Sequence, residues 1–231
     1  MEKNKIGKYL KFAIVEIVLV MVGILLAVQV NNWNENRKSK IKEIKTLKEL
    51  RSDLAQNLED IEINIAHLID SQNSNEIIIS HIENNIPYND SLDYHFWNLY
   101  PYITFNVNQT TYESLKQMGF NLISNDSLRI SISDLYANKF TGYRNFENTY
   151  LIEHHNNAVK PMFMSEFTPF DSSSSAVHPK NYTQFMNDPK YKAIISWTAL
   201  TCRNFADMQS GLKEDVEKLM AQIDKEIDES K

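Results

Sequence analysis

The chain has 231 residues, with 24 Lys and Arg, 30 Asp and Glu, six His, one Cys and five Gly. One cysteine excludes an internal disulfide and a CxxC redox or zinc site, and five glycines leave little room for a Gly-rich nucleotide loop. The net charge of −6 argues against general nucleic-acid binding, which needs a basic surface. No nucleic-acid partner is therefore expected.

The charge is unevenly distributed along the chain. Residues 1–51 carry 11 basic and 5 acidic side chains, whereas residues 52–231 carry 13 basic and 25 acidic ones. A basic start followed by an acidic body is typical of a protein with one end at a membrane surface and the rest in water.

Residues 12–30 form an apolar run of 19 residues that only Glu16 and Gln29 interrupt. A helix of this length spans roughly 28 Å, close to the hydrocarbon thickness of a bilayer. The alternative is a signal peptide, whose apolar stretch is about 7–15 residues and ends in a small-x-small site. This run is longer, and the bulky Trp33 follows it. We therefore predict an uncleaved transmembrane anchor over 12–33, with Trp33 as an interfacial aromatic.

The orientation of this anchor rests on its flanks. The tail 1–11 holds four lysines, and five basic residues follow between 37 and 45, so the two sides nearly balance. A short tail with four lysines is costly to translocate, whereas long carboxy-terminal domains cross largely regardless of charge. We expect a single-pass protein of the inner (cytoplasmic) membrane, with a cytoplasmic amino terminus and a periplasmic soluble domain.

Four residues of the span share one helical face. Glu16, Val20, Gly23 and Ala27 are separated by 4, 3 and 4 residues, and Gly23 and Ala27 form a small-xxx-small pair that lets two helices approach closely. We predict this face as a membrane-helix interface. Two alternatives for Glu16 stay open: it lies near the boundary and reaches lipid headgroups, or it carries protons.

Downstream of the span the sequence predicts long amphipathic helices. The first continues over 34–90, with an expected break at 70–74 and a stop at Pro87. Its apolar stripe follows spacings of mostly 3 and 4 and comprises Ile41, Ile44, Leu47, Leu50, Leu54, Leu58, Ile61, Ile65, Leu68 and Ile69.

Residues 91–108 are rich in aromatics and are the least helical stretch. We expect a packed loop or a short strand here. Its aromatic side chains form either a satellite core or a ligand pocket, and the pocket would be lined by Tyr94, Trp97, Tyr100 and Tyr102.

The carboxy-terminal half predicts three further helices. Thr110 and Glu113 have the spacing of a capping box at the start of a short helix that ends at Gly119. The segment 124–127 opens a second helix, whose apolar face comprises Leu128, Ile132, Leu135, Tyr136, Phe140, Tyr143, Phe146, Tyr150 and Leu151. Residues 168–189 read as an exposed connection. The last helix begins near Pro189, and its stripe comprises Tyr191, Ile194, Ile195, Thr198, Cys202, Phe205, Leu212, Val216, Leu219, Ile223 and Ile227.

The predicted fold is therefore all-α, with an N-terminal single transmembrane helix followed by an antiparallel helical bundle or coiled-coil-like soluble domain. The expected organisation is a basic tail over 1–11, the anchor over 12–33, a juxtamembrane helix over 34–90 and the remainder of the bundle over 91–231.

Two parts of the chain carry motifs of a known family. The amino-terminal part contains Lys8-Tyr9-Leu10, Ala13-Ile14-Val15-Glu16-Ile17 and the run from Val22 to Glu35. The central part contains the runs Thr111 to Lys116 and Leu122 to Arg129. With these motifs the chain resembles the DUF6090 proteins of Bacteroidota. The resemblance covers the first 50 residues and roughly 109–136. It implies a membrane-anchored helical protein of unassigned activity and supplies no catalytic residue.

Catalytic and metal-binding patterns are weak. His154 and His155 are adjacent and diverge by about 100° on a helix, so we expect solvated or capping roles. Cys202 lies in an apolar stripe, where a buried thiol acts as a small hydrophobe. We expect no enzyme activity, no metal and no cofactor.

Three functions fit these patterns. The preferred one is a membrane-anchored interaction or scaffold protein that oligomerises or holds a membrane-protein partner in the lipid bilayer. The second is an extracytoplasmic sensor or ligand-binding helical bundle. The third is an accessory subunit of an ion-driven membrane machine that uses Glu16.

Overall fold

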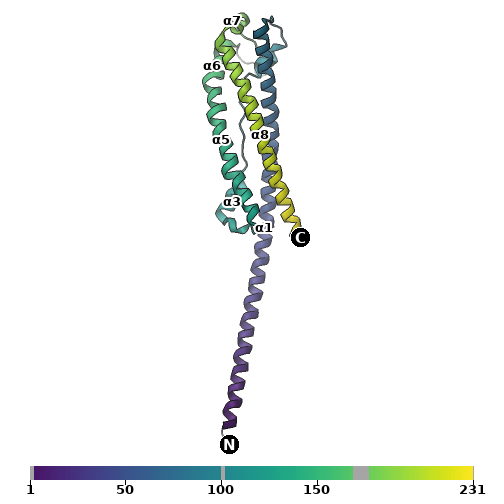
Figure 1. Ribbon diagram of the computed structural model, residues 1–231, viewed down its shortest axis with the longest axis vertical. Coiled ribbons are helices and arrows are strands. Elements are labelled where there is room, and N and C mark those ends of the chain that lie inside the picture. Colours follow the sequence, from purple (N-terminus) through teal and green to yellow (C-terminus); the bar gives the residue numbers. More distant parts are fainter. Residues whose placement is uncertain (1–2, 100–101, 169–176, 231) are drawn as a thin grey trace. The chain divides into compact units, whose positions relative to one another are not determined.

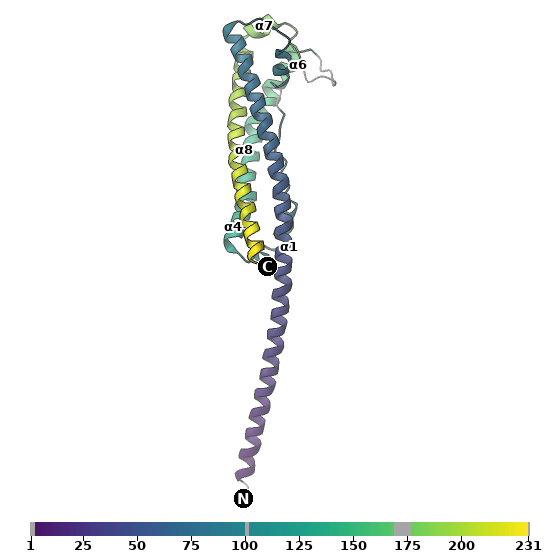
Figure 2. The same cartoon turned by 90° about the vertical axis from the view of Figure 1, so that its right-hand side faces the viewer.

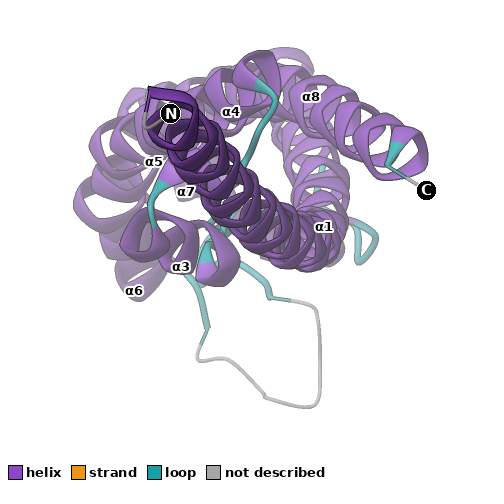
Figure 3. Ribbon diagram, turned by 90° about the horizontal axis from the view of Figure 1, so that it is seen from below, coloured by secondary structure: helices purple, strands orange, loops and turns teal. Residues whose placement is uncertain are grey.

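The computed structural model describes residues 3–99, 102–168 and 177–230. Within these ranges the regular structure is helical and no strand occurs, apart from one isolated bridge between Phe167 and Pro179 (Figure 3). The all-α prediction is confirmed. The elements are α1 (Lys3–Asn84), α2 (Leu92–Trp97), α3 (Thr110–Met118), η1 (Phe120–Leu122), α4 (Asp126–Ser133), η2 (Asp134–Phe140), α5 (Thr141–Phe146), η3 (Glu147–Ile152), η4 (His155–Val159), α6 (Lys160–Glu166), α7 (Tyr182–Asn187) and α8 (Pro189–Glu229).

The chain divides into two compact units, Met1–Leu47 and Lys48–Lys231. Helix α1 contains no proline, and Gly23 is its only glycine after residue 7, so little in its sequence interrupts it. The expected break at 70–74 is wrong, because α1 continues unbroken through these residues. Asn85 adopts φ = 51°, a left-handed conformation that asparagine tolerates, and the Ile86 amide donates to the His81 carbonyl at 3.1 Å. This is a Schellman-type end, followed by Pro87.

In the second unit, the buried faces of α1 and α8 both follow strict alternating spacings of 3 and 4. On α1 this series comprises Leu50, Leu54, Asn57, Ile61, Asn64, Leu68, Ser71, Asn75 and Ile78, and Asp53 and Ser74 are buried beside it. On α8 they include Tyr191, Ile195, Thr198, Cys202, Phe205, Gln209, Leu212, Val216, Leu219 and Ile223. The α8 stripe is confirmed almost completely.

The predicted stripe on α1 is wrong at several positions. Ile41 is 60% exposed and Ile69 is 45% exposed. The reason is that Asn57, Asn64 and Ser71 occupy buried positions of the repeat, which a search for apolar residues alone passes over. We call Asn57, Asn64, Ser71 and Asn75 the polar seam of α1.

Helices α1 and α8 lie side by side within the second unit and run in opposite directions (Figure 2). Four of the ion pairs between them show the opposite order, because the residue number falls on α8 as it rises on α1. They are Arg51 with Asp224 (2.7 Å), Glu62 with Lys213 (2.7 Å), Glu76 with Arg203 (2.9 Å) and Glu83 with Lys192 (3.1 Å). Exposed pairs of this kind stabilise a fold little. They therefore indicate how α1 and α8 are aligned and contribute little to maintaining that alignment.

Residues 126–166 form a third long helical run, from α4 to α6, and it lies beside α8 (Figure 1). The Asn125 side chain caps it by accepting from the Leu128 amide at 3.1 Å, which confirms the predicted start. Three π-helical segments, η2, η3 and η4, interrupt its α-helical geometry. Each π turn holds more residues than an α turn and therefore shifts the register of the side chains that follow.

This shift explains a wrong prediction on the same helical run. Phe146 and Tyr150 were expected on the buried face, but they are 51% and 50% exposed. Both lie after the π-helical segment η2, where an extrapolation at 3.6 residues per turn no longer holds. Tyr143 and Leu151 are buried as predicted, and Glu147, which was not predicted there, is buried between them.

An extended segment precedes α3, and its backbone is held by helix side chains. The Asn106 amide donates to Asp60 at 3.0 Å, and the Asn108 amide donates to Asn57 at 2.6 Å. The Phe105 amide donates to Glu147 at 3.0 Å. Because no neighbouring strand is present among the described residues, these carboxylates and amides satisfy donors that would otherwise be unpaired.

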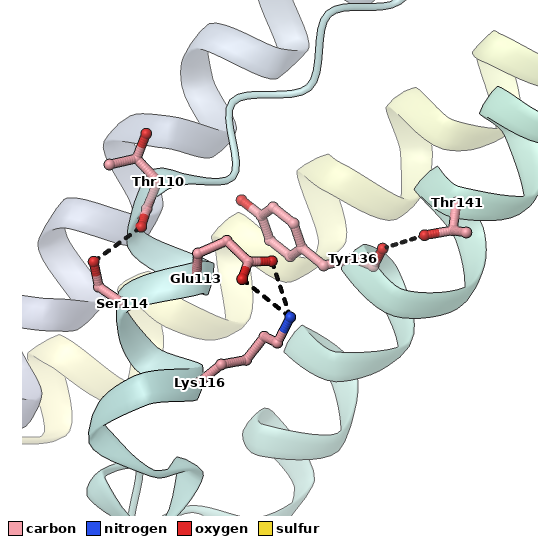
Figure 4. A network of polar contacts seen from close by, with 6 residues as sticks. All are labelled: Thr110, Glu113, Ser114, Lys116, Tyr136 and Thr141. Atoms are coloured by element: carbon pink, nitrogen blue, oxygen red, sulfur yellow. Dashed lines mark hydrogen bonds and ion pairs between the residues drawn. The ribbon is translucent and has the colours of Figure 1, made fainter.

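The predicted capping box at the start of α3 is wrong. Thr110 is already helical, and Glu113 pairs with Lys116 at 3.0 Å (Figure 4). The first amides are satisfied from elsewhere, because the Thr111 amide donates to Asp53 of α1 at 2.8 Å and the Thr110 amide donates to Asn108 at 3.1 Å. The predicted cap at Gly119 is confirmed by its φ of 92°.

Residues 177–188, which were expected to be part of an exposed connection, are partly helical and partly buried. They include α7, and Val177, Phe185 and Met186 are buried in a cluster with Phe96 and Phe163. The four serines of the run lie at 172–175, outside the described residues. Helix α8 begins at Pro189 as predicted, with Asp188 accepting from the Lys190 amide at 2.8 Å.

Asp53 provides a direct test of this remote cap. We expect Asp53→Ala to destabilise the chain by about 1–2 kcal/mol, because the buried carboxylate is the acceptor for the α3 amide. The measurement is the thermal unfolding midpoint of the full chain by circular dichroism. Glu59→Ala, which removes an exposed acid from the same helix, is the control. Equal midpoints for the two variants would contradict the assignment.

Candidate functional site

The amino-terminal part of α1 is the described helix that is long and apolar enough to cross a membrane. Its apolar window is unburied within the chain, unlike a core helix of a globular protein. Such a helix is compatible with a membrane anchor by length and composition. Trp33, the predicted interfacial aromatic, is 64% exposed.

Glu16, Val20, Gly23 and Ala27 all lie in α1, so their spacing places them on one face of a continuous helix. All four are exposed. No heavy atom outside the local helix backbone lies within 4 Å of a Cβ built on Gly23, so the space above this glycine is open. The face therefore carries no contact from the rest of the chain at Gly23.

The residues of the predicted aromatic pocket lie in separate environments. The Tyr94 hydroxyl donates to Asp70 at 2.7 Å, while Trp97 packs against the buried cluster that contains Phe96. The Tyr102 ring lies 5.1 Å from the ring of His155, between centroids. Tyr100 lies outside the described residues.

The histidines and the cysteine are packed into the helices. His154 shares a hydrogen bond of 2.8 Å with Thr198 and is half-buried, and His155 is buried, so the expectation that both are solvated or capping is wrong. Burial raises the pKa of the Cys202 thiol to about 11, and its Sγ lies 3.5 Å from Ser71. A thiol with this pKa stays protonated at neutral pH and is a poor nucleophile.

Among the described residues no group of three His, Cys, Asp or Glu side chains is arranged to hold a metal ion. The polar seam instead binds backbone and neighbouring side chains. Asn57 bonds both backbone groups of Asn108, and the Ser71 hydroxyl donates to the Asn98 carbonyl at 2.8 Å. These buried groups thus position the segment between α2 and α3.

Glu147 is the buried carboxylate that links this segment to the third helical run. It is 4% exposed and accepts the Phe105 amide. Burial raises the pKa of Glu147, a shift that the hydrogen bonds from Phe105 and Tyr143 partly oppose. Burial also raises the pKa of Tyr143, whose hydroxyl accepts from Gln209 at 2.6 Å.

A groove opens on the surface between the third helical run and α8. Its volume is about 480 Å³, within the range of small-molecule sites. Four half-exposed apolar side chains, Phe146, Tyr150, Trp197 and Leu200, line it. Its remaining lining residues are Thr201, Asn204, Phe205, Asp207 and Met208. Sequence reasoning missed this groove, because it placed Phe146 and Tyr150 in the core.

Glu147 predicts a specific pH dependence. Because the folded chain binds this proton more tightly than the unfolded chain, the contribution of Glu147 is largest below the ordinary glutamate pKa and falls as the pH rises through the raised value. We expect Glu147→Gln, relative to wild type, to gain stability as the pH rises above about 4.5.

The measurement is the unfolding midpoint of wild type and variant across this pH range. Glu153→Gln, at an exposed position of the same helical run, is the control and should follow the wild type. Parallel curves for wild type and Glu147→Gln would mean that the buried carboxyl does not titrate differently in the folded chain.

A family of known sequence pattern matches this chain. The pattern of DUF6090, described as a family of unknown function, matches residues 16–173. The match covers more than half of the 231 residues and includes the face with Glu16, Val20, Gly23 and Ala27, the polar seam and the third helical run. Comparisons with curated proteins and with solved structures gave no match. The chain therefore belongs to DUF6090.

Proposed function

We propose that this chain is a single-pass inner-membrane protein that self-associates through its membrane helix and holds an acidic helical domain on the periplasmic side. The observation that carries the proposal is the unburied apolar window of α1. An apolar helix surface of this length is unstable in water and is stable in lipid.

The face with Glu16, Val20, Gly23 and Ala27 would form the contact between the membrane helices. Open space above Gly23 leaves room for the backbone of another helix. Glu16 on the same face would point to the neighbouring helix, where its carboxyl is shielded from lipid. A second copy of the chain is the partner that supplies a matching face without further assumptions.

The domain beyond the membrane fits a scaffold in this proposal. The alternating 3 and 4 spacings of α1 and α8, with their four ion pairs, support an antiparallel bundle with coiled-coil-like packing. The chain would act by binding and not by catalysis. The protonated Cys202 thiol and the structural engagement of Glu147 and His154 support that assignment.

Light scattering of the full-length protein in detergent tests the proposal. We expect a defined oligomer, and we expect Gly23→Leu to lower its association constant by roughly tenfold, because the larger side chain separates the helices. Val18→Leu introduces the same side chain on the opposite face of the helix and should leave the mass of the oligomer unchanged. A monomeric wild-type protein would refute self-association.

A further inference from the structure

The groove between the third helical run and α8 contains an aromatic surface that the packing of the chain does not use. Phe146, Tyr150 and Trp197 each leave half of their surface exposed. The Phe146 and Tyr150 rings lie 5.2 Å apart, between centroids, with planes tilted by 32°. Single exposed aromatic side chains are normal on a protein surface and need no explanation. Several exposed aromatic rings around one groove, in contrast, are typical of a binding site.

A carboxylate lines the same groove. Within the part of the chain that the structure describes, Asp207 has no hydrogen-bond or ion-pair partner. Arg203 lies one turn earlier on α8, but its guanidinium pairs with Glu76 of α1 at 2.9 Å. The groove thus contains a free negative charge next to aromatic rings and no positive charge.

The two features have a defined order along the groove. Trp197 and Asp207 are ten residues apart on α8, a distance of about 15 Å along the helix axis. The hydrogen bonds of Tyr143 with Gln209 and of His154 with Thr198 lie within two residues of the ends of this stretch. They set Phe146 at the level of Asp207, with Tyr150 and then Trp197 further along. The anionic end therefore includes Phe146, and the other end is purely apolar.

This arrangement selects a ligand by charge and shape. A cation is attracted by the Asp207 carboxylate and by the negative faces of aromatic rings, and both attractions act at the same end. The acidic body of the chain, with 25 acidic and 13 basic residues over 52–231, adds a field that concentrates cations. An anion would meet repulsion from the same groups.

We propose that this groove binds an organic cation with an apolar or aromatic body, whose ammonium group lies between Asp207 and Phe146 and whose body lies along Tyr150 and Trp197. The site goes beyond the proposed membrane-helix association, because it lies in the second unit and needs no second copy. It would make the bundle a receptor for amphiphilic ammonium compounds.

Calorimetric titration of the full chain in lipid nanodiscs tests the proposal, with empty nanodiscs as the blank for partitioning into lipid. The probes are 4-phenylbutyltrimethylammonium and the neutral 4-phenylbutanol, which share the apolar body. We expect the ammonium compound to bind at least about tenfold more tightly than the alcohol.

Variants separate the charge from the aromatic surface. Asp207→Asn should weaken binding of the ammonium compound about tenfold and leave the alcohol unchanged. Phe146→Leu keeps an apolar side chain but loses the ring, so it should weaken only the ammonium compound. Glu214→Gln removes an exposed acid elsewhere on α8 and should behave as wild type.

Three results would overturn the proposal. The first is equal affinity for the two probes or no binding of either. The second is an equal effect of Asp207→Asn and Glu214→Gln, which would assign the attraction to general surface charge. The third is a change of oligomer mass in Phe146→Leu or Trp197→Leu without binding of the probe, which would place a second copy of the chain in the groove.

Discussion

The opposed register of α1 and α8 is the constraint on which the rest of the second unit depends. It sets Ser71 beside Cys202 and aligns Arg51 with Asp224 and Glu83 with Lys192. The third helical run then takes its level from α8 through Tyr143 with Gln209 and His154 with Thr198. A slip of one heptad between α1 and α8 would break the Ser71–Cys202 contact and these exposed ion pairs, each of which stabilises the fold little by itself. The polar residues of the seam hold the segment between α2 and α3 against α1, because Asn57 bonds Asn108 and Ser71 bonds Asn98.

Features that depend on nearby residues were predictable from the sequence. The stripe on α8, the Asn125 cap, the turn at Gly119 and the start at Pro189 each involve residues within a few positions of one another. In the same way, the apolar window of α1 is visible in the composition alone. The family resemblance was correct because it rests on contiguous motifs.

Features that depend on distant residues were not predictable in this way. The cap of α3 comes from Asp53, 58 residues before the amide that it binds. The extended segment is held by Asp60, Asn57 and Glu147, and only the fold brings these side chains together. A heptad count that admits polar residues would have found Asn57, Asn64 and Ser71, because they follow Leu50 at intervals of seven. The groove lined by Phe146 and Tyr150 was not predicted for another reason. The π-helical segments break the helical period from which the buried face was extrapolated.

The proposed roles use different surfaces of the chain. The face around Gly23 would join copies within the bilayer, while the groove at Phe146 and Asp207 would bind a small cation at the acidic domain. Each role depends on side chains that remain exposed after the chain has packed. Residues that stabilise the fold through buried hydrogen bonds, such as Glu147 and the polar seam, lie in neither surface.

The central claim is that copies of the chain associate through the face around Gly23. Disulfide cross-linking in native membranes tests this claim most directly. Single cysteines at positions 18, 20, 22, 23 and 27, each in a Cys202→Ala background, would report which face of α1 meets another copy. We expect strong cross-linking for Val20→Cys, Gly23→Cys and Ala27→Cys and weak cross-linking for Val18→Cys and Val22→Cys, the pattern of a helix with one contact face. Cross-linking that is uniform along the helix, or absent at all five positions, would contradict this claim.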